Sequence, residues 1–237
     1  MEDKASEGAD SIEAPACSFY KVEPERQGKL VWISGPPGLG KSTTAQLLSR
    51  KHGYVYYEAD CFFMLRNPYI PPNAPEPSLA CSEQNKLVGG GAEEREEMAV
   101  KVVGQFRRMF GGEEVDYQVI EEGVRMICRD IKKERARIGG DWAVCCVLHT
   151  RKMREIVREE LGEDLLVICL HMDMEEQMVR IRSRHSGDEK VVKRMKTVYK
   201  LCQPPDPDEI KTCKVKIDSR KSPLDVLQMV VEKINTR

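Results

Sequence analysis

The sequence lacks the features that mark membrane, secreted and zinc-binding proteins. No apolar run in the 237 residues approaches the roughly 20 that a membrane-spanning helix needs. The acidic start at Met1–Asp10 has no apolar core of the kind found in secretory signals. The 9 cysteines include no C-x-x-C pair, and Cys145, Cys146 and Cys169 stand in apolar runs, where cysteine behaves as a small hydrophobe. We therefore expect a cytoplasmic protein in a reducing compartment.

An excess of charge of one sign is also missing. The formal net charge is −1, which argues against a nucleic-acid partner bound through bulk basicity. With 32% charged and 41% hydrophobic residues, the composition is that of an ordinary globular protein. We expect a monomer or a homodimer with a small-molecule substrate and with neither a nucleic-acid nor a membrane partner. Residues 1–28 contain few bulky apolar side chains and are predicted to be a flexible tail, followed by one folded domain at 29–237.

One short stretch organises that domain. Leu30–Ile33 is apolar and rich in strand formers, Gly35–Ser42 fits G-x-x-x-x-G-K-[ST] at every fixed position, and Thr43–Arg50 has the pattern of a packed helix. Strand, glycine loop and helix together predict a site for a nucleoside triphosphate, although a glycine-rich turn that binds nothing is the alternative. The predicted contacts are Gly35, Pro36, Pro37, Gly38, Leu39, Gly40, Lys41, Ser42 and Thr43.

Each residue type in the loop has a physical purpose. Glycines let successive backbone N–H groups point inward as an anion nest, and the next helix adds its positive N-terminal end. Lys41 can reach the β- and γ-phosphates, and the Ser42 hydroxyl can bind Mg²⁺. We therefore expect ATP and Mg²⁺ as the ligands, with Lys41 as a catalytic residue.

Further strands are predicted at 54–58, 142–147, 165–170 and 213–217, alternating with helices. Apolar strands between helices predict an α/β fold, a three-layer sandwich of about five parallel strands with helices on both faces. A proline-rich insert at 68–77 and two helices within 92–140 make residues 61–140 a loop and helical insertion, which we expect to form the acceptor side of the site.

Asp60 follows the second strand, at the edge where parallel strands place their ligands. A carboxylate there can orient or deprotonate an acceptor hydroxyl, or hold Mg²⁺; a turn cap is the alternative. No strand ends in the apolar run plus aspartate of a Walker B element. Asp173 comes three positions late after its strand and is predicted as a helix N-cap, so Asp60 is expected to be the catalytic, substrate-binding and metal-binding acid.

Arginines complete the expected site. Arg180 and Arg184 lie one helical turn apart, and at the closing of a lid over residues 174–201 they would stabilise the charge that phosphoryl transfer spreads over oxygens. A solvated basic helix face is the alternative. Among the basic residues that follow the third strand, one, such as Arg151, is expected to contact substrate or phosphate.

At this point the chain resembles the small P-loop kinases of the gluconate/shikimate kinase group, gluconokinases most of all, over roughly 29–234. Glu58-Ala59-Asp60 is similar to the acidic motif of that family, which implies that Asp60 contacts a hydroxylated substrate. The segment 86–95 is similar to a family segment that gives Arg95 a substrate role, and 147–155 to one that contains Arg151. The lid arginines are also similar.

The substrate side departs from the family pattern. Val147 and Thr150 stand where the family has serine and lysine, the Gly-His-Phe after the lid arginines is absent, and the insert at 68–77 is foreign. The resemblance therefore implies an ATP-dependent phosphotransferase acting on a small hydroxyl-bearing metabolite, sugar-acid-like or similar. A nucleoside or nucleotide kinase, and a nucleotide-binding regulatory protein with little turnover, are the alternative hypotheses.

Overall fold

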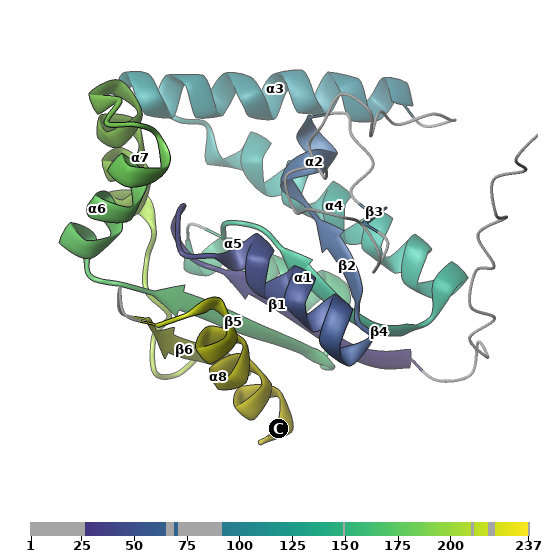
Figure 1. Ribbon diagram of the computed structural model, residues 1–237. Helices are drawn as coiled ribbons and strands as arrows, with labels where there is room; N and C mark the ends of the chain where they lie inside the picture. Colours follow the sequence, from purple (N-terminus) through teal and green to yellow (C-terminus); the bar gives the residue numbers. More distant parts are fainter. Residues whose placement is uncertain are drawn as a thin grey trace, which may run out of the picture.

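A twisted sheet forms the centre of the molecule (Figure 1). The structure is a computed structural model and describes residues 27–64, 69–70, 92–148, 150–209, 211–217 and 221–236. Its strands are β1 (Gln27–Ser34), β2 (Val55–Glu58), β3 (Tyr69–Ile70), β4 (Gly140–Cys145), β5 (Leu165–His171) and β6 (Thr212–Lys216). The sheet order is β3-β2-β4-β1-β5-β6, and every pair is parallel except β2 with β3. The predicted parallel α/β sheet is confirmed, with β3 as an additional antiparallel edge strand.

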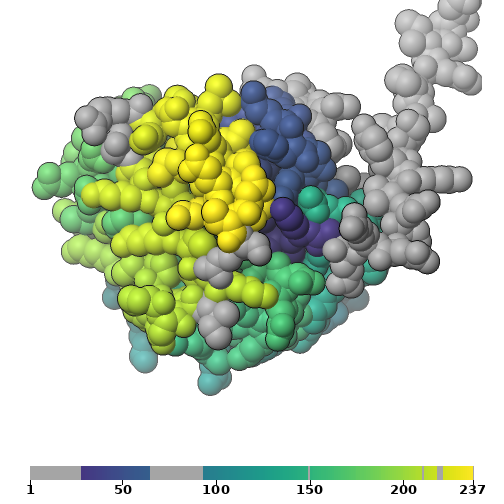
Figure 2. All heavy atoms as spheres, turned by 90° about the horizontal axis from the view of Figure 1, so that it is seen from below, coloured from purple at the N-terminus to yellow at the C-terminus, as the bar shows by residue number. Residues whose placement is uncertain are grey.

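Helices connect the strands and cover both faces of the sheet (Figure 1). They are α1 (Lys41–His52), α2 (Asp60–Phe63), α3 (Ala92–Gly111), α4 (Tyr117–Ile138), α5 (Arg151–Leu161), α6 (Met174–Arg184), α7 (Glu189–Leu201) and α8 (Pro223–Asn235). Strand residues alternate between two cores, so that Ala143 and Cys145 pack with α1 and α8, while Trp142 and Val144 pack with α4 and α5. Figure 2 shows α8 in yellow lying against α1 in blue.

The helical insertion is smaller than expected. The apolar stripe of α4 packs on the sheet face beside Trp142 and Val144, so α4 belongs to the sandwich. Outside the sandwich, α3 packs against α2, α4 and α7 (Figure 1). The four-residue helix α2 lacks the length to show a period and is not among the predicted elements.

Two predicted boundaries fall near or beyond the described residues. β1 begins at Gln27, so the last two residues of the predicted tail belong to the strand, and residues 1–26 lie outside the description. Of the insert at 68–77, only Tyr69 and Ile70 are described. Across the described ranges, the structure contains no helix long and apolar enough to cross a membrane.

Candidate nucleotide-binding site

The loop between β1 and α1 has a backbone that only glycine adopts easily. Gly35, Gly38 and Gly40 have φ angles of 135°, 84° and 82°, in the region where a Cβ is strained. A Cβ at Gly35 would lie 2.4 Å from the Leu170 carbonyl oxygen, and one at Gly38 would lie 3.1 Å from Ile181 Cγ1. The glycines of the motif are therefore required by loop shape and by close packing.

Lys41, the first residue of α1, lies inside this loop. Its side chain is buried, and Nζ donates a hydrogen bond to the Pro36 carbonyl oxygen at 3.1 Å. Gly40 precedes the helix in a left-handed conformation and provides no side-chain cap. The loop thus adjoins both the start of α1, where the first N–H groups have no helical acceptors, and the Lys41 ammonium. A helix N-terminus beside a cation is the arrangement that binds phosphate oxygens.

A buried carboxylate lies beside the loop. Glu58 ends β2 and is 4% exposed; its Oε2 accepts a hydrogen bond from the Tyr56 hydroxyl, while Oε1 is buried without a hydrogen-bond partner among the described residues. Burial and the nearby Asp60 raise the pKa of Glu58 to about 7, and Tyr56, Ser42 and Lys41 act in the opposite direction. Next to it, the Ser42 hydroxyl lies 3.5 Å from Cys145 Sγ.

Asp60, the first residue of α2, lies in the same group. The Cys146 thiol donates to Asp60 Oδ1 at 3.7 Å. Although water reaches this residue, the surrounding protein raises the pKa of the Asp60 carboxyl, and the charge of Lys41 and the thiol of Cys146 lower it. The structure thus places Lys41 and Asp60 within one electrostatic site, as expected from strand order.

The residues present fit a triphosphate with a hard cation. The glycine cradle and Lys41 suit phosphate oxygens, while the Ser42 hydroxyl and a carboxylate with an orphaned buried oxygen suit Mg²⁺. The strand next to β1, where a Walker B acid is expected, ends at Cys145, so the acids come from β2 and α2 instead. Glu58 is the residue that sequence reasoning missed as a separate group. Its spacing of two from Tyr56 on one strand face was the available signal.

α6, which follows β5 in the chain, contacts the phosphate loop through residues other than its arginines. Gln177 is fully buried and its Nε2 donates to the Pro37 carbonyl oxygen, and Ile181 packs beside Gly38. Arg180 is half-buried and Arg184 is exposed near the end of the helix. The predicted arginine pair therefore lies on the helix that contacts the loop, and its catalytic role stays a prediction.

Arg95 has contacts that hold α2 in place. Nε donates to the Phe62 carbonyl oxygen at 2.7 Å and a terminal nitrogen donates to the Cys61 carbonyl oxygen at 3.3 Å. The guanidinium also lies 4.1 Å from the centre of the Phe62 ring. Because α2 begins with Asp60, Arg95 positions that carboxylate's helix, and its expected contact with substrate stays a prediction.

Arg151 and Arg154 are three residues apart and have different environments. Arg151, at the start of α5, is partly buried with a side chain 41% exposed, and it pairs with Glu155, Asp206 and Asp208 at 2.9 to 3.1 Å. Arg154 is 1% exposed and pairs with Glu209 at 2.6 Å. Its Nη1 donates to the Gln203 carbonyl oxygen after α7, and Nη2, which also pairs with Glu209, donates to the Pro204 carbonyl oxygen. The contacts of both arginines fix the segment after α7.

Comparisons with known proteins agree with this geometry. A family model described as the Rad17 P-loop domain matches residues 18–84. A cytidylate kinase from Dichelobacter nodosus is 46% identical over 37 residues, which is 16% of each chain. The solved structure of a gluconokinase from Sinorhizobium meliloti has a TM-score of 0.57 at 16% identity, covering 89% of this chain and 93% of that one. A sugar kinase from Janibacter has a TM-score of 0.57 at 18% identity, covering 88% and 95%.

These findings define the class of fold. The chain has the α/β fold of P-loop kinases, with the nucleotide-binding loop at the end of its central strand. Within that class it is similar in fold to gluconokinase along most of both chains, so the predicted likeness is confirmed at the level of the fold. The match to the cytidylate kinase spans only 16% of that relative's length.

Proposed function

We propose that this protein is an ATP-dependent phosphotransferase that moves the γ-phosphoryl group to a hydroxyl of a small metabolite, sugar-acid-like or similar. The observation that carries the proposal is that Lys41, which lies inside the phosphate loop, is near enough to Asp60 for its charge to lower the pKa of that carboxyl. A cation that binds phosphate and a carboxylate that faces solvent are the two groups that an in-line transfer to a hydroxyl requires.

The chain's own groups then have defined tasks. The loop and Lys41 bind the β- and γ-phosphates, and Asp60 orients the acceptor hydroxyl and accepts its proton. The acceptor oxygen forms a bond to the γ-phosphorus as the bond to the β–γ bridging oxygen breaks, and ADP leaves. Ser42, Asp60 and Glu58 would together hold Mg²⁺, and the ion would neutralise phosphate charge. Arg180 and Arg184 approach the transferred group when α6 and α7 close over it.

A nucleoside or nucleotide kinase is the second candidate. The observation in its favour is the short stretch of 46% identity to a cytidylate kinase. The phosphate donor side is expected to be the same in both classes. The two candidates differ in the acceptor alone, so one assay separates them.

That assay measures acceptor-dependent ADP formation with ATP and Mg²⁺ across sugar acids, polyols, nucleosides and nucleotides. Turnover with a sugar acid or polyol supports the first proposal, and turnover with nucleosides or nucleotides alone supports the second. ATP binding without acceptor-dependent turnover would instead indicate a nucleotide-binding regulatory protein.

The variant Lys41→Ala tests the phosphate-binding site. We expect a loss of about 10²-fold or more in turnover, because the side chain donates to the transferring phosphates. Lys51→Ala, which removes an exposed charge near the end of the same helix, should leave the kinetics unchanged. Normal kinetics in Lys41→Ala would overturn the proposal.

A further inference from the structure

A cavity of about 410 Å³ opens on the other side of β1 from Glu58 and Asp60. Its walls come from the entry of the phosphate loop, the end of β5, the start of α6, and residues 199–205, which are the end of α7 and the segment that follows it. The Tyr199 hydroxyl donates to the Met172 carbonyl oxygen at 3.1 Å, and the buried Arg154 is bonded to the carbonyls of Gln203 and Pro204. These bonds fix the walls, so the cavity is part of the folded structure.

The lining of this cavity is basic. Arg154, His171, Lys200 and Lys214 line it, and no aspartate or glutamate does among the described residues. Lys200 and Lys214 are exposed, at its mouth. Burial lowers the pKa of His171, and so does the charge of Lys214, whereas Asp173 raises it. Glu209 neutralises Arg154, whose nitrogens are all bonded to Glu209 or to the carbonyls of Gln203 and Pro204. The groups that remain to attract an anion are therefore Lys200, Lys214 and His171, while Asp173 pairs with Lys216.

The rest of the lining is apolar. It includes Leu148, Leu170, Met174, Pro204 and Pro205. A volume near 400 Å³ lies within the range of small-molecule sites, which combine apolar walls with a few polar groups. The chemistry therefore selects an anionic head on an apolar or ring-shaped body.

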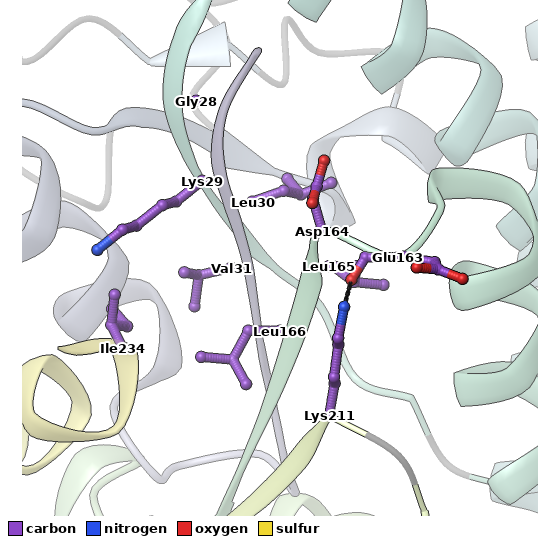
Figure 3. Close-up of a pocket in the computed structure, with 10 residues that line it drawn as sticks. All are labelled: Gly28, Lys29, Leu30, Val31, Glu163, Asp164, Leu165, Leu166, Lys211 and Ile234. Carbon is purple, nitrogen blue, oxygen red and sulfur yellow. Dashed lines mark hydrogen bonds between the residues drawn. The ribbon is translucent and has the colours of Figure 1, made fainter. Parts of the chain in front are cut away.

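A second cavity in the structure lacks a lining of one charge sign. It has a volume of about 300 Å³ and lies at the opposite end of the strands, where β1 and β5 begin, next to α8 (Figure 3). There Lys211 donates to the Glu163 carbonyl oxygen, and the Glu163 side chain points away from Val31 and Leu166. Charges of both signs line it, so this second cavity selects no ligand class.

We propose that the basic cavity, lined by Arg154, His171, Lys200 and Lys214, is a binding site for a small organic phosphate or carboxylate, separate from the acceptor position beside Asp60. Because Gly35 and Pro36 also line it, a bound anion would contact the phosphate loop and the base of the α6–α7 pair at the same time. This proposal does not depend on whether the protein catalyses phosphoryl transfer.

The test uses phenyl phosphate as the probe, with phenol as the neutral control and inorganic phosphate as the anion without a ring. Binding to the full chain is measured by calorimetry with Mg²⁺ and a saturating non-hydrolysable ATP analogue, which occupies the phosphate loop. We expect saturable binding of phenyl phosphate, weaker binding of inorganic phosphate and none of phenol. Competition between phenyl phosphate and the ATP analogue would overturn the proposal, as would equal binding of phenol.

Matched lysine variants test the location. Lys214→Gln and Lys200→Gln should each weaken phenyl phosphate about three- to fivefold, the scale of an exposed charge contact. Lys193→Gln and Lys196→Gln, on the same helix as Lys200, remove equal charge outside the cavity and should change affinity less than about twofold. Equal losses in all four variants would indicate diffuse attraction and contradict the site. In a proton NMR titration, the His171 imidazole signals should shift with phenyl phosphate and not with phenol.

Discussion

The two sides of the central strand β1 have opposite chemistry. Toward β2 and β4 lie the carboxylates of Glu58 and Asp60, which we call the acidic side. Toward β5 and β6 lie Arg154, His171, Lys200 and Lys214, which we call the basic side. The phosphate loop stands between them. At the carboxyl ends of the strands, groups that can bind a cation or a proton thus lie on one side of β1, and groups that attract anions lie on the other. The order of the strands produces this separation.

The largest expected effect is on the basic side. Arg154→Ala removes the closest partner of the buried Glu209 and leaves it with Arg158 at 3.3 Å, so it should lower the free energy of unfolding by about 3 kcal/mol. Arg151→Ala removes a partly exposed guanidinium from the same segment and should have a much smaller effect. Urea denaturation of both variants measures the difference. Equal losses would mean that the segment after α7 is not held by the buried pair.

The next effect concerns pH on the acidic side. The pKa of Glu58 is about 7 in the folded protein against 4.5 for the free group, so its contribution to stability is full below pH 4.5 and is lost as the pH rises through 7. The loss is on the order of 3 kcal/mol. Glu58→Gln should remove it, flattening the unfolding free energy between pH 4.5 and 8. Glu232→Gln, on the exposed face of α8, should keep the wild-type profile; the same profile in Glu58→Gln would refute the assignment.

Asp60→Asn tests the acidic side in turnover. We expect acceptor-dependent turnover to fall about 10²-fold, the usual scale for a positioned acid–base group, while ATP affinity stays nearly unchanged. Steady-state kinetics and nucleotide titration separate the two. Asp173→Asn, an exposed carboxylate at the start of α6, is the matched control. Full turnover in Asp60→Asn would remove Asp60 from the proposed mechanism.

The smallest effect is expected in the loop between the two sides. An added Cβ at Gly40 meets no atom within 4 Å, so Gly40→Ala should cost only the left-handed backbone strain, about 1–2 kcal/mol. Gly35→Ala adds a collision with the Leu170 carbonyl oxygen and should destabilise more. Thermal unfolding of the two variants gives the comparison. A larger loss at Gly40 would contradict the loop geometry.

Local patterns predicted the sheet, the phosphate loop and most helices. Leu30–Ile33 and Leu165–Leu170 are apolar on both sides, as only buried parallel strands are, and both are confirmed. The grouping of Lys41 with Asp60 also followed from topology. Local patterns could not predict which side chains distant in sequence form ion pairs. Asp173 precedes α6 as predicted, but its carboxylate pairs with Lys216 and makes no cap hydrogen bond.

The arginines show the same limit in sharper form. Arg151 and Arg154 belong to one basic run, and nothing local distinguishes a partly exposed guanidinium from a buried one. The difference comes from Glu209, more than fifty residues later, whose carboxylate is enclosed with Arg154. Arg95 is likewise defined by the carbonyls of α2, a helix too short to be predicted.

The outer strands have a consequence for self-association. In the described sheet β6 is one edge, and Lys214 and Lys216 occupy alternate positions of its five residues, while β3 at the other edge has only two residues. Lysines on an edge strand oppose pairing with the edge of a second copy. The folded protein is therefore expected to resist edge-to-edge polymerisation through β6 at high concentration.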